Sequence, residues 1–322
     1  MDKYTEDTKK WLDERFTKCD ENGIYFAHQP IYGFRKGHSE RGIIERHIRT
    51  YEILKALACL RFSSLVDIGG AEGFKANLAS KLFNCRVTNS DLSEQACKRA
   101  NELFGMESRQ ADIHSLPFRD GEFDVVLCSE TLEHVTDFDR ALDELLRVAR
   151  IGVIITVPHE PKHLTEENIE GDVPHAHIHN FKLDSLEFVR EKYGYSVLSK
   201  PLISPFIRIP AAIVEAMPRN PDELREIPRI AIKAYNAVVP VLRTVFGKRV
   251  GAWLMRYDEF LCRLLGRHTA LLFVIIKDNA SWGLMSRRIS PLDILNFGVP
   301  FHYLHRQGRH ESAFARTSHS GT

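Results

Sequence analysis

Short β-rich runs alternate with amphipathic stretches through the middle of the chain. The runs are at residues 64–68, 85–91, 108–112, 123–129 and 152–158. Strands that alternate with helices in this way are typical of βαβ units, because parallel strands need a crossover connection. The pattern therefore predicts an α/β fold built on a parallel sheet.

The stretch before the last of these runs shows the helical period most clearly. Its apolar positions are spaced i, i+3, i+4 and i+7: Leu142, Leu145, Leu146 and Ala149. Thr136 and Asp139 have the spacing of a capping box. The sequence therefore predicts a helix that begins after Thr136 and packs one face on the sheet.

The two ends of the chain carry other patterns. Residues 1–46 are largely helical in pattern and are expected to cap the α/β domain, which we place at residues 47–280. Residues 269–278 predict a final apolar strand. The segment at about 204–267 predicts a helical insertion before that strand, and residues 281–322 predict a tail disordered at its end.

Composition excludes several classes of protein. The formal net charge of +1 lacks the basic excess of nucleic-acid binders, so nucleic acid is not expected as a partner. The six cysteines contain no C-x-x-C pair, and the N-terminus has no apolar signal region, which predicts reduced thiols and a cytoplasmic protein. Lys233, Arg243 and Arg249 interrupt the best candidate for a membrane span.

A glycine-rich turn follows the first run directly. Gly69, Gly70 and Gly73 occupy a strand-to-helix turn where a backbone can approach a ligand closely. Asp91 and Asp112 end the next two runs, where acids can bind ribose hydroxyls and an adenine amino group. An ordinary turn with solvated strand ends is the alternative interpretation.

Several stretches in register resemble the class I S-adenosylmethionine-dependent methyltransferases, in particular their types 11 and 23. They are VDIGGAEG, SDLS, ADIHSLPFRDGEFDVVLCSETLEHV, RVARIGVIITVPHE and HIHNFKLDSLEFVREKYGY, over about residues 45 to 200. The resemblance implies a Rossmann-like doubly wound sheet of seven strands and S-adenosyl-L-methionine as cofactor. It implies these cofactor-binding residues: Asp67, Gly69, Gly70, Gly73, Asp91, Leu92, Asp112, Ile113 and Ser129.

Two details refine this resemblance. In the family, the acid before the turn, here Asp67, acts near the methionine amino group. Ala71 replaces the middle glycine of the commonest form of the turn. In a dinucleotide-binding G-x-G-x-x-G, Ala71 and Phe74 would stand at glycine positions, so a dehydrogenase is disfavoured.

The fourth run is followed by Glu130, Glu133 and His134, which share one face if they lie on a helix. This E-x-x-E-H resembles the metal-binding element of the ubiquinone-pathway and small-RNA 2′-O-methyltransferases. A fourth ligand, expected at His179, would come from the downstream histidines: His159, His175, His177 and His179. Glu130, His134 and His179 are the candidate catalytic residues. The alternative is a metal-free site in which His134 lines the acceptor cleft.

The function expected from these features is S-adenosylmethionine-dependent O-methylation of a small or lipid-linked hydroxyl-bearing acceptor. The alternatives are C- or N-methylation, or cofactor binding without turnover.

The insertion has eleven Lys or Arg against six Asp or Glu from Arg208 to Arg267. It can act as a lid over a hydrophobic acceptor, lie on a membrane surface, or merely pack on the domain. His28 and Tyr32 can close over the cofactor or pack the cap. The oligomeric state is left open.

Overall fold

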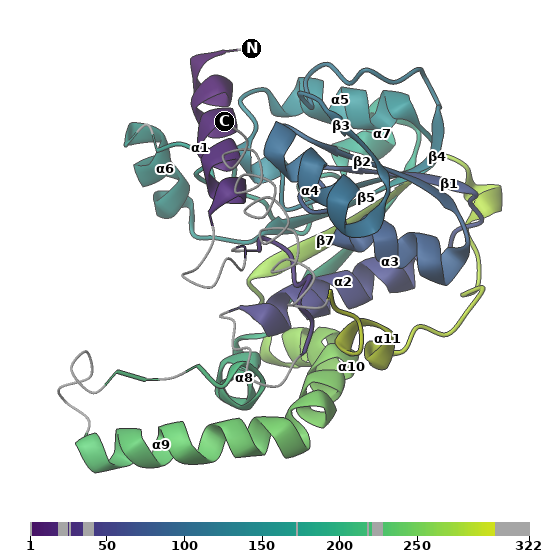
Figure 1. The fold of residues 1–322 in the computed structure, drawn as a ribbon. Helices are drawn as coiled ribbons and strands as arrows, with labels where there is room; N and C mark the ends of the chain where they lie inside the picture. The colour runs from purple at the N-terminus through teal and green to yellow at the C-terminus, as the bar shows by residue number, and fades with distance from the viewer. Residues whose placement is uncertain are drawn as a thin grey trace, which may run out of the picture.

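The computed structural model describes residues 2–18, 25, 27–34, 42–171, 173–217, 219–220 and 228–299. At its centre is a seven-stranded sheet in the order β3-β2-β1-β4-β5-β7-β6 (Figure 1). The strands are β1 (Ser64–Ile68), β2 (Arg86–Asp91), β3 (Glu107–Gln110), β4 (Phe123–Ser129), β5 (Ala149–Pro158), β6 (Ser196–Leu202) and β7 (Ala270–Ile276). β7 pairs antiparallel with both of its neighbours, and the other pairs are parallel. The predicted α/β fold class is confirmed.

Most of the strands lie where the apolar runs predicted them. β1 and β4 have the predicted bounds, whereas β3 ends at Gln110 and leaves Asp112 in the following loop. β3 ends there because of its pairing register. It is an edge strand that pairs only with β2, and Gln110 lies opposite Asp91, the last residue of β2, so no strand residue remains to pair with Asp112.

Helices cover both faces of the sheet. One face carries α2 (Ile43–Ala58), α3 (Phe74–Phe83), α4 (Glu94–Phe104) and α11 (Pro291–Leu295). The opposite face carries α5 (Phe138–Val148) and α7 (Phe188–Tyr193). Two large apolar clusters result, one on each face, because strands buried on both faces need both layers to exclude water. α1 (Lys3–Thr17) and α6 (Lys162–Glu170) lie beyond these layers.

The helical insertion lies between β6 and β7, as predicted. It contains α8 (Arg208–Glu215), α9 (Arg229–Leu242), a π-helical turn (Arg243–Gly247) and α10 (Lys248–Leu265). The last three form one continuous helix of 37 residues instead of separate helices, and α9 projects from the body (Figure 1). By length and composition alone, this is the single helix in the described part of the chain that could cross a membrane. The sequence did not predict such a candidate span.

The first part of the C-terminal tail packs on the domain. A capping box at Ser290 begins α11, and Ile294, Leu295 and Val299 are buried against the domain. The predicted disorder concerns residues 300–322, which lie outside the described residues.

The predicted cap of α5 is wrong by one residue. The Asp137 side chain accepts a hydrogen bond from the Arg140 N–H at 3.0 Å, whereas the Thr136 hydroxyl donates to Asp2 at 2.8 Å. Capping chemistry therefore depends on backbone geometry at Asp137 and not on the spacing of Thr136 alone.

Removing the α5 cap provides a test of this assignment. Asp137→Ala is expected to lower the free energy of unfolding by about 1 kcal/mol, because it leaves a helix N-terminal N–H without its acceptor. Thr136→Ala, which removes an exposed bond to Asp2, is expected to cost less than half of that. Urea denaturation measures both values. A larger loss for Thr136→Ala would contradict the assignment of Asp137 as the cap.

Candidate functional site

A cavity of about 440 Å³ opens at the carboxyl ends of β1, β2 and β4. Its volume is in the range of small-molecule sites. The strand order reverses between β1 and β4, and ligands of open α/β sheets bind outside such a switch point. Of the predicted cofactor residues, these line it: Gly69, Asp91, Leu92, Asp112, Ile113 and Ser129.

The glycines of the turn are needed for packing as well as for ligand approach. Gly69 has φ +70°, and a Cβ there would lie 2.1 Å from the Thr131 hydroxyl. A Cβ at Gly70 would lie 2.0 Å from the side-chain oxygen of Asn89. The turn therefore lies directly on its neighbours, and only Gly69 of the three predicted glycines faces the cavity.

Asp91 is placed where a ribose-binding acid is needed. Its two carboxylate oxygens accept hydrogen bonds from the Ala71 N–H at 2.9 Å and the Ser93 N–H at 2.8 Å. Burial raises the pKa of this carboxyl to about 6. Each carboxylate oxygen has a further lone pair, so Asp91 can accept from ligand hydroxyls while it holds the turn.

Asp67 is placed differently from what the resemblance implied. It is fully buried behind the turn, does not line the cavity, and its oxygens have no hydrogen-bond partner among the described residues. Burial raises its pKa to about 6, an effect that Lys75 opposes. A role for Asp67 near the methionine amino group therefore stays a prediction.

The part of the cavity that follows β3 combines acidic and apolar groups. One oxygen of Asp112 accepts from the N–H of His114 at 3.0 Å and lies 2.7 Å from its Nδ1. That hydrogen bond lowers the pKa of Asp112, so the group is ionised at neutral pH. Ile113 and Leu92 provide apolar walls beside it, which suits a flat heterocycle with a polar edge.

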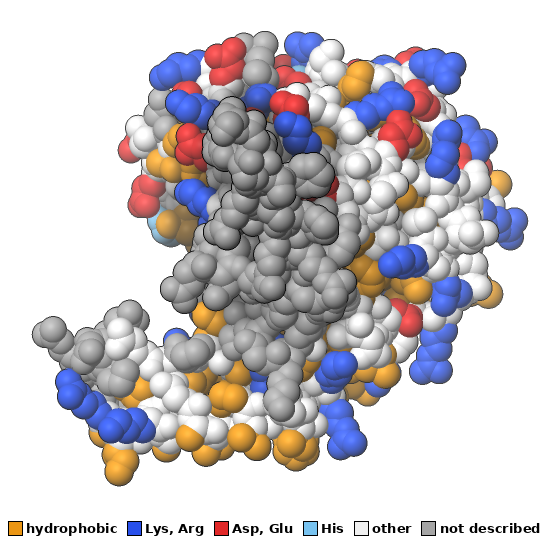
Figure 2. All heavy atoms as spheres, viewed as in Figure 1, with side chains coloured by type: hydrophobic (Ala, Val, Ile, Leu, Met, Phe, Trp, Pro, Cys, Tyr) orange, Lys and Arg blue, Asp and Glu red, His pale blue; other side chains and the backbone are white. Residues whose placement is uncertain are grey.

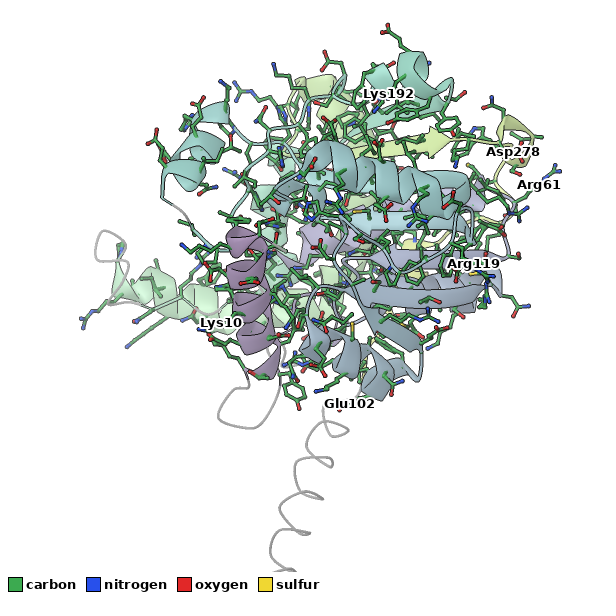
Figure 3. All side chains as sticks on the ribbon, turned by 90° about the horizontal axis from the view of Figure 1, so that it is seen from above. Lys10, Arg61, Glu102, Arg119, Lys192 and Asp278 are labelled. Atoms are coloured by element: carbon green, nitrogen blue, oxygen red, sulfur yellow. The ribbon has the colours of Figure 1, made fainter. Side chains whose placement is uncertain are left out.

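Helix α1 closes one side of the cavity. The sequence predicted only that residues 1–46 cap the α/β domain, not that a helix lines the site. Thr5, Thr8, Leu12 and Phe16 line the cavity at i, i+3, i+7 and i+11, a spacing that could have revealed this face. Lys10, labelled in Figure 3, lies on the exposed side of the same helix.

A hydrogen bond and a loop residue complete this wall. Asp13 of α1 accepts a hydrogen bond from the Ser93 hydroxyl at 2.6 Å, which holds α1 against the start of α4. His28 lines the cavity and stacks on Phe16 with ring centroids 4.5 Å apart, whereas Tyr32 is buried in the core and donates to the Tyr25 carbonyl. Of the two candidate closing residues, only His28 reaches the site.

The E-x-x-E-H element is not one α-helix. Glu130 adopts the left-handed region, with φ +59°, and Leu132–His134 forms a 3₁₀ turn. Glu130 pairs with Arg49, with its Oε2 3.0 Å from the guanidinium. Glu133 is buried with no hydrogen-bond partner among the described residues, and burial raises its pKa well above the usual range.

His134 is held as a neutral base. Its Nδ1 lies 3.0 Å from the Ala176 carbonyl, which can only accept, so Nδ1 carries the proton and Nε2 keeps its lone pair. Burial lowers its pKa well below the usual range, and the ring stacks on His175 at 3.8 Å. His134 lines the cavity.

His177, and not His179, completes the cluster. One ligand atom from each of Glu133, His134 and His177 lies within 4.8 Å of the others. His179 instead donates from Nε2 to the Val135 carbonyl at 2.6 Å, and neither it nor Glu130 belongs to this group. The prediction of Glu130 as a ligand assumed a continuous helix, which the left-handed backbone of Glu130 interrupts, and the prediction of His179 came from the resemblance alone.

Comparison with known proteins agrees with this geometry. Residues 66–157 match the model of a methyltransferase domain family. This part of the chain carries a methyltransferase domain. The match includes the glycine turn, Asp91, Asp112, Glu133 and His134, whereas α1, Arg49 and His177 lie outside it.

Curated relatives of the methyltransferase domain differ in their acceptors. Tocopherol O-methyltransferase of Arabidopsis thaliana is 31% identical over 180 residues, which are 52% of this chain and 51% of that protein. Norajmaline N-methyltransferase of Rauvolfia serpentina is 29% identical and covers 34% and 41%, respectively. Fatty-acid O-methyltransferase of Mycolicibacterium smegmatis is 31% identical and covers 35% and 43%. The chain spans about half or less of the length of these relatives, and their acceptors do not identify its own.

Proposed function

We propose that this chain catalyses S-adenosylmethionine-dependent methyl transfer to the oxygen of a small or lipid-linked hydroxyl-bearing acceptor. The observation that supports this most is the position of His134, a neutral imidazole with a free Nε2 lone pair, in the same cavity as Asp91. An oxygen acceptor must lose its proton during transfer, whereas an activated carbon needs no such base.

The residues present fit the cofactor. Asp91 would bind the ribose hydroxyls, while Asp112, Ile113 and Leu92 would hold the adenine. The bound cofactor supplies an electrophilic methyl group. The protein aligns the acceptor with that group and excludes water, since α1 covers this side of the cavity.

The cluster of Glu133, His134 and His177 also fits a divalent metal ion. Glu133 and the Nε2 atoms of the two histidines are acceptors, and no donor of the described residues satisfies the Glu133 carboxylate. The Nδ1 of His177 lies 2.8 Å from Glu160, the carboxylate–imidazole arrangement that orients histidines on metals. A metal held by Glu133, His134 and His177 would acidify the acceptor hydroxyl.

A two-stage assay tests the proposed activity. Calorimetry is expected to show binding of S-adenosylmethionine and not of NAD. Incubation of the full chain and methyl-labelled cofactor with cell extract is expected to label an acceptor through an ether oxygen. Preferred NAD binding would overturn the cofactor assignment, and a label on carbon or nitrogen would overturn O-methylation.

The metal assignment predicts a specific loss. Purified protein is expected to retain about one divalent ion per chain, and Glu133→Gln and His177→Asn are each expected to weaken that binding by at least about tenfold, because three ligands become two. Elemental analysis after dialysis measures it. His159→Asn is the control, since His159 bonds to the Phe181 carbonyl outside the cluster.

Equal retention in all variants would remove the metal from the proposal. His134 would then act as the base by itself.

A further inference from the structure

An apolar strip runs along the outer side of the helical insertion. It consists of Ile230, Val238, Val241 and Val245 on α9 and the π-helical turn, and of Trp253, Tyr257, Phe260 and Leu264 on α10. The α10 residues are spaced i, i+4, i+7 and i+11, so they share one face. Figure 2 shows hydrophobic side chains along the lower edge of α9, with Lys and Arg near its ends.

A basic rim follows this apolar strip. Arg249, Arg256 and Arg267 are exposed on α10 or just after it, and Lys233 is exposed on α9. Arg256 stands three residues after Trp253 on α10, so it flanks the strip, whereas Arg267 follows the end of this helix. None of these four cations forms an ion pair within the described residues.

The acids of α10 do not neutralise this rim. Asp258 is buried and accepts hydrogen bonds from the N–H groups of Ile203 and Ser204. Glu259 pairs with Lys200 at 2.9 Å and with Arg263 at 3.2 Å. The exposed side of α10 is therefore apolar along its centre and cationic along one border.

The side of α10 opposite the strip packs on protein. Leu254 and Met255 are buried in the core, and Gly251 faces Leu295 of α11. Arg243, at the junction with α9, is buried and donates to the Val214 carbonyl of α8 at 2.8 Å. A helix packed on one side and bordered by charges can lie in the plane of a membrane surface, but lipid cannot surround it as it surrounds a spanning helix.

We propose that the apolar strip and the basic rim together dock this chain on the surface of a bilayer that contains anionic lipid. The strip enters the boundary between headgroups and acyl chains, where Trp, Tyr and Phe are favoured, and the rim pairs with lipid phosphates. This interaction does not depend on the methyl-transfer assignment.

Vesicle flotation with the full chain tests the proposal. The parent is expected to float with phosphatidylcholine vesicles that contain phosphatidylglycerol, and weakly with phosphatidylcholine alone. Phe260→Ser/Leu264→Ser, at positions 61% and 66% exposed, is expected to lower the binding at least about tenfold. Leu284→Ser is the control, because Leu284 is 98% exposed and lies outside the insertion.

A second pair of substitutions tests the rim. Arg256→Gln/Arg267→Gln is expected to lower binding to the anionic vesicles several-fold, and added salt is expected to do the same to the parent. The proposal is overturned if the parent does not bind anionic vesicles, or if the strip variants bind as the control does. It is also overturned if the strip variants convert a dimer to a monomer while no form binds vesicles.

Discussion

Replacing His134 by Asn is expected to lower the rate of methyl transfer at saturating cofactor by about 10²- to 10⁴-fold. The substitution removes the Nε2 lone pair, the one feature of this side chain that can take a proton or bind a metal, while an amide N–H can still donate to the Ala176 carbonyl. The affinity for S-adenosylmethionine is expected to change less than about threefold. Single-turnover kinetics and calorimetry measure the two quantities.

His159→Asn is the matched control for this experiment. It also removes an imidazole near the carboxyl ends of the strands, but His159 bonds to the Phe181 carbonyl and does not line the cavity. Its rate is expected to equal that of the parent. A His134→Asn rate within tenfold of the parent would contradict both a base and a metal at this position, and would favour an acceptor that needs no deprotonation.

The Asp91→Asn substitution is expected to weaken S-adenosylmethionine binding by about 10²-fold or more. A carboxylate accepts charge-assisted bonds from ribose hydroxyls, each worth about 1.5–3 kcal/mol. The amide also places an NH₂ group against one of the two backbone N–H donors, on Ala71 or Ser93. Calorimetry measures the affinity. Asp139→Asn is the control, because Asp139 is exposed on α5.

The pH dependence of binding follows from the same group. Because burial raises the pKa of Asp91 to about 6, its carboxyl becomes protonated as pH falls through that value and loses accepting capacity. Cofactor affinity is therefore expected to be full above about pH 7 and to decrease below pH 6. The Asp91→Asn variant is expected to lose this dependence. If the dependence persists, a different group titrates, with Asp67 the next candidate, since its pKa is also raised to about 6.

The strands and the glycine turn could be predicted because their signals are local. β1 and β4 are buried over their full length and most of their residues are apolar. Gly69 stands where the backbone of the turn takes a positive φ. Asp91 ends β2 and Asp112 lies just after β3, in the parallel part of the sheet, where the carboxyl ends of the strands meet at one edge. Their convergence on the cavity therefore follows from the order of the elements.

The sequence by itself predicted the α/β fold, the resemblance to methyltransferases and the acids at or just beyond the ends of β2 and β3. Only the tertiary structure decided that His177 joins Glu133 and His134, that Glu130 turns to Arg49, and that α1 lines the cavity. These outcomes depend on contacts between residues far apart in the chain and on one positive φ at Glu130. Periodicity reports which face of an element is buried, but not which distant segment covers that face.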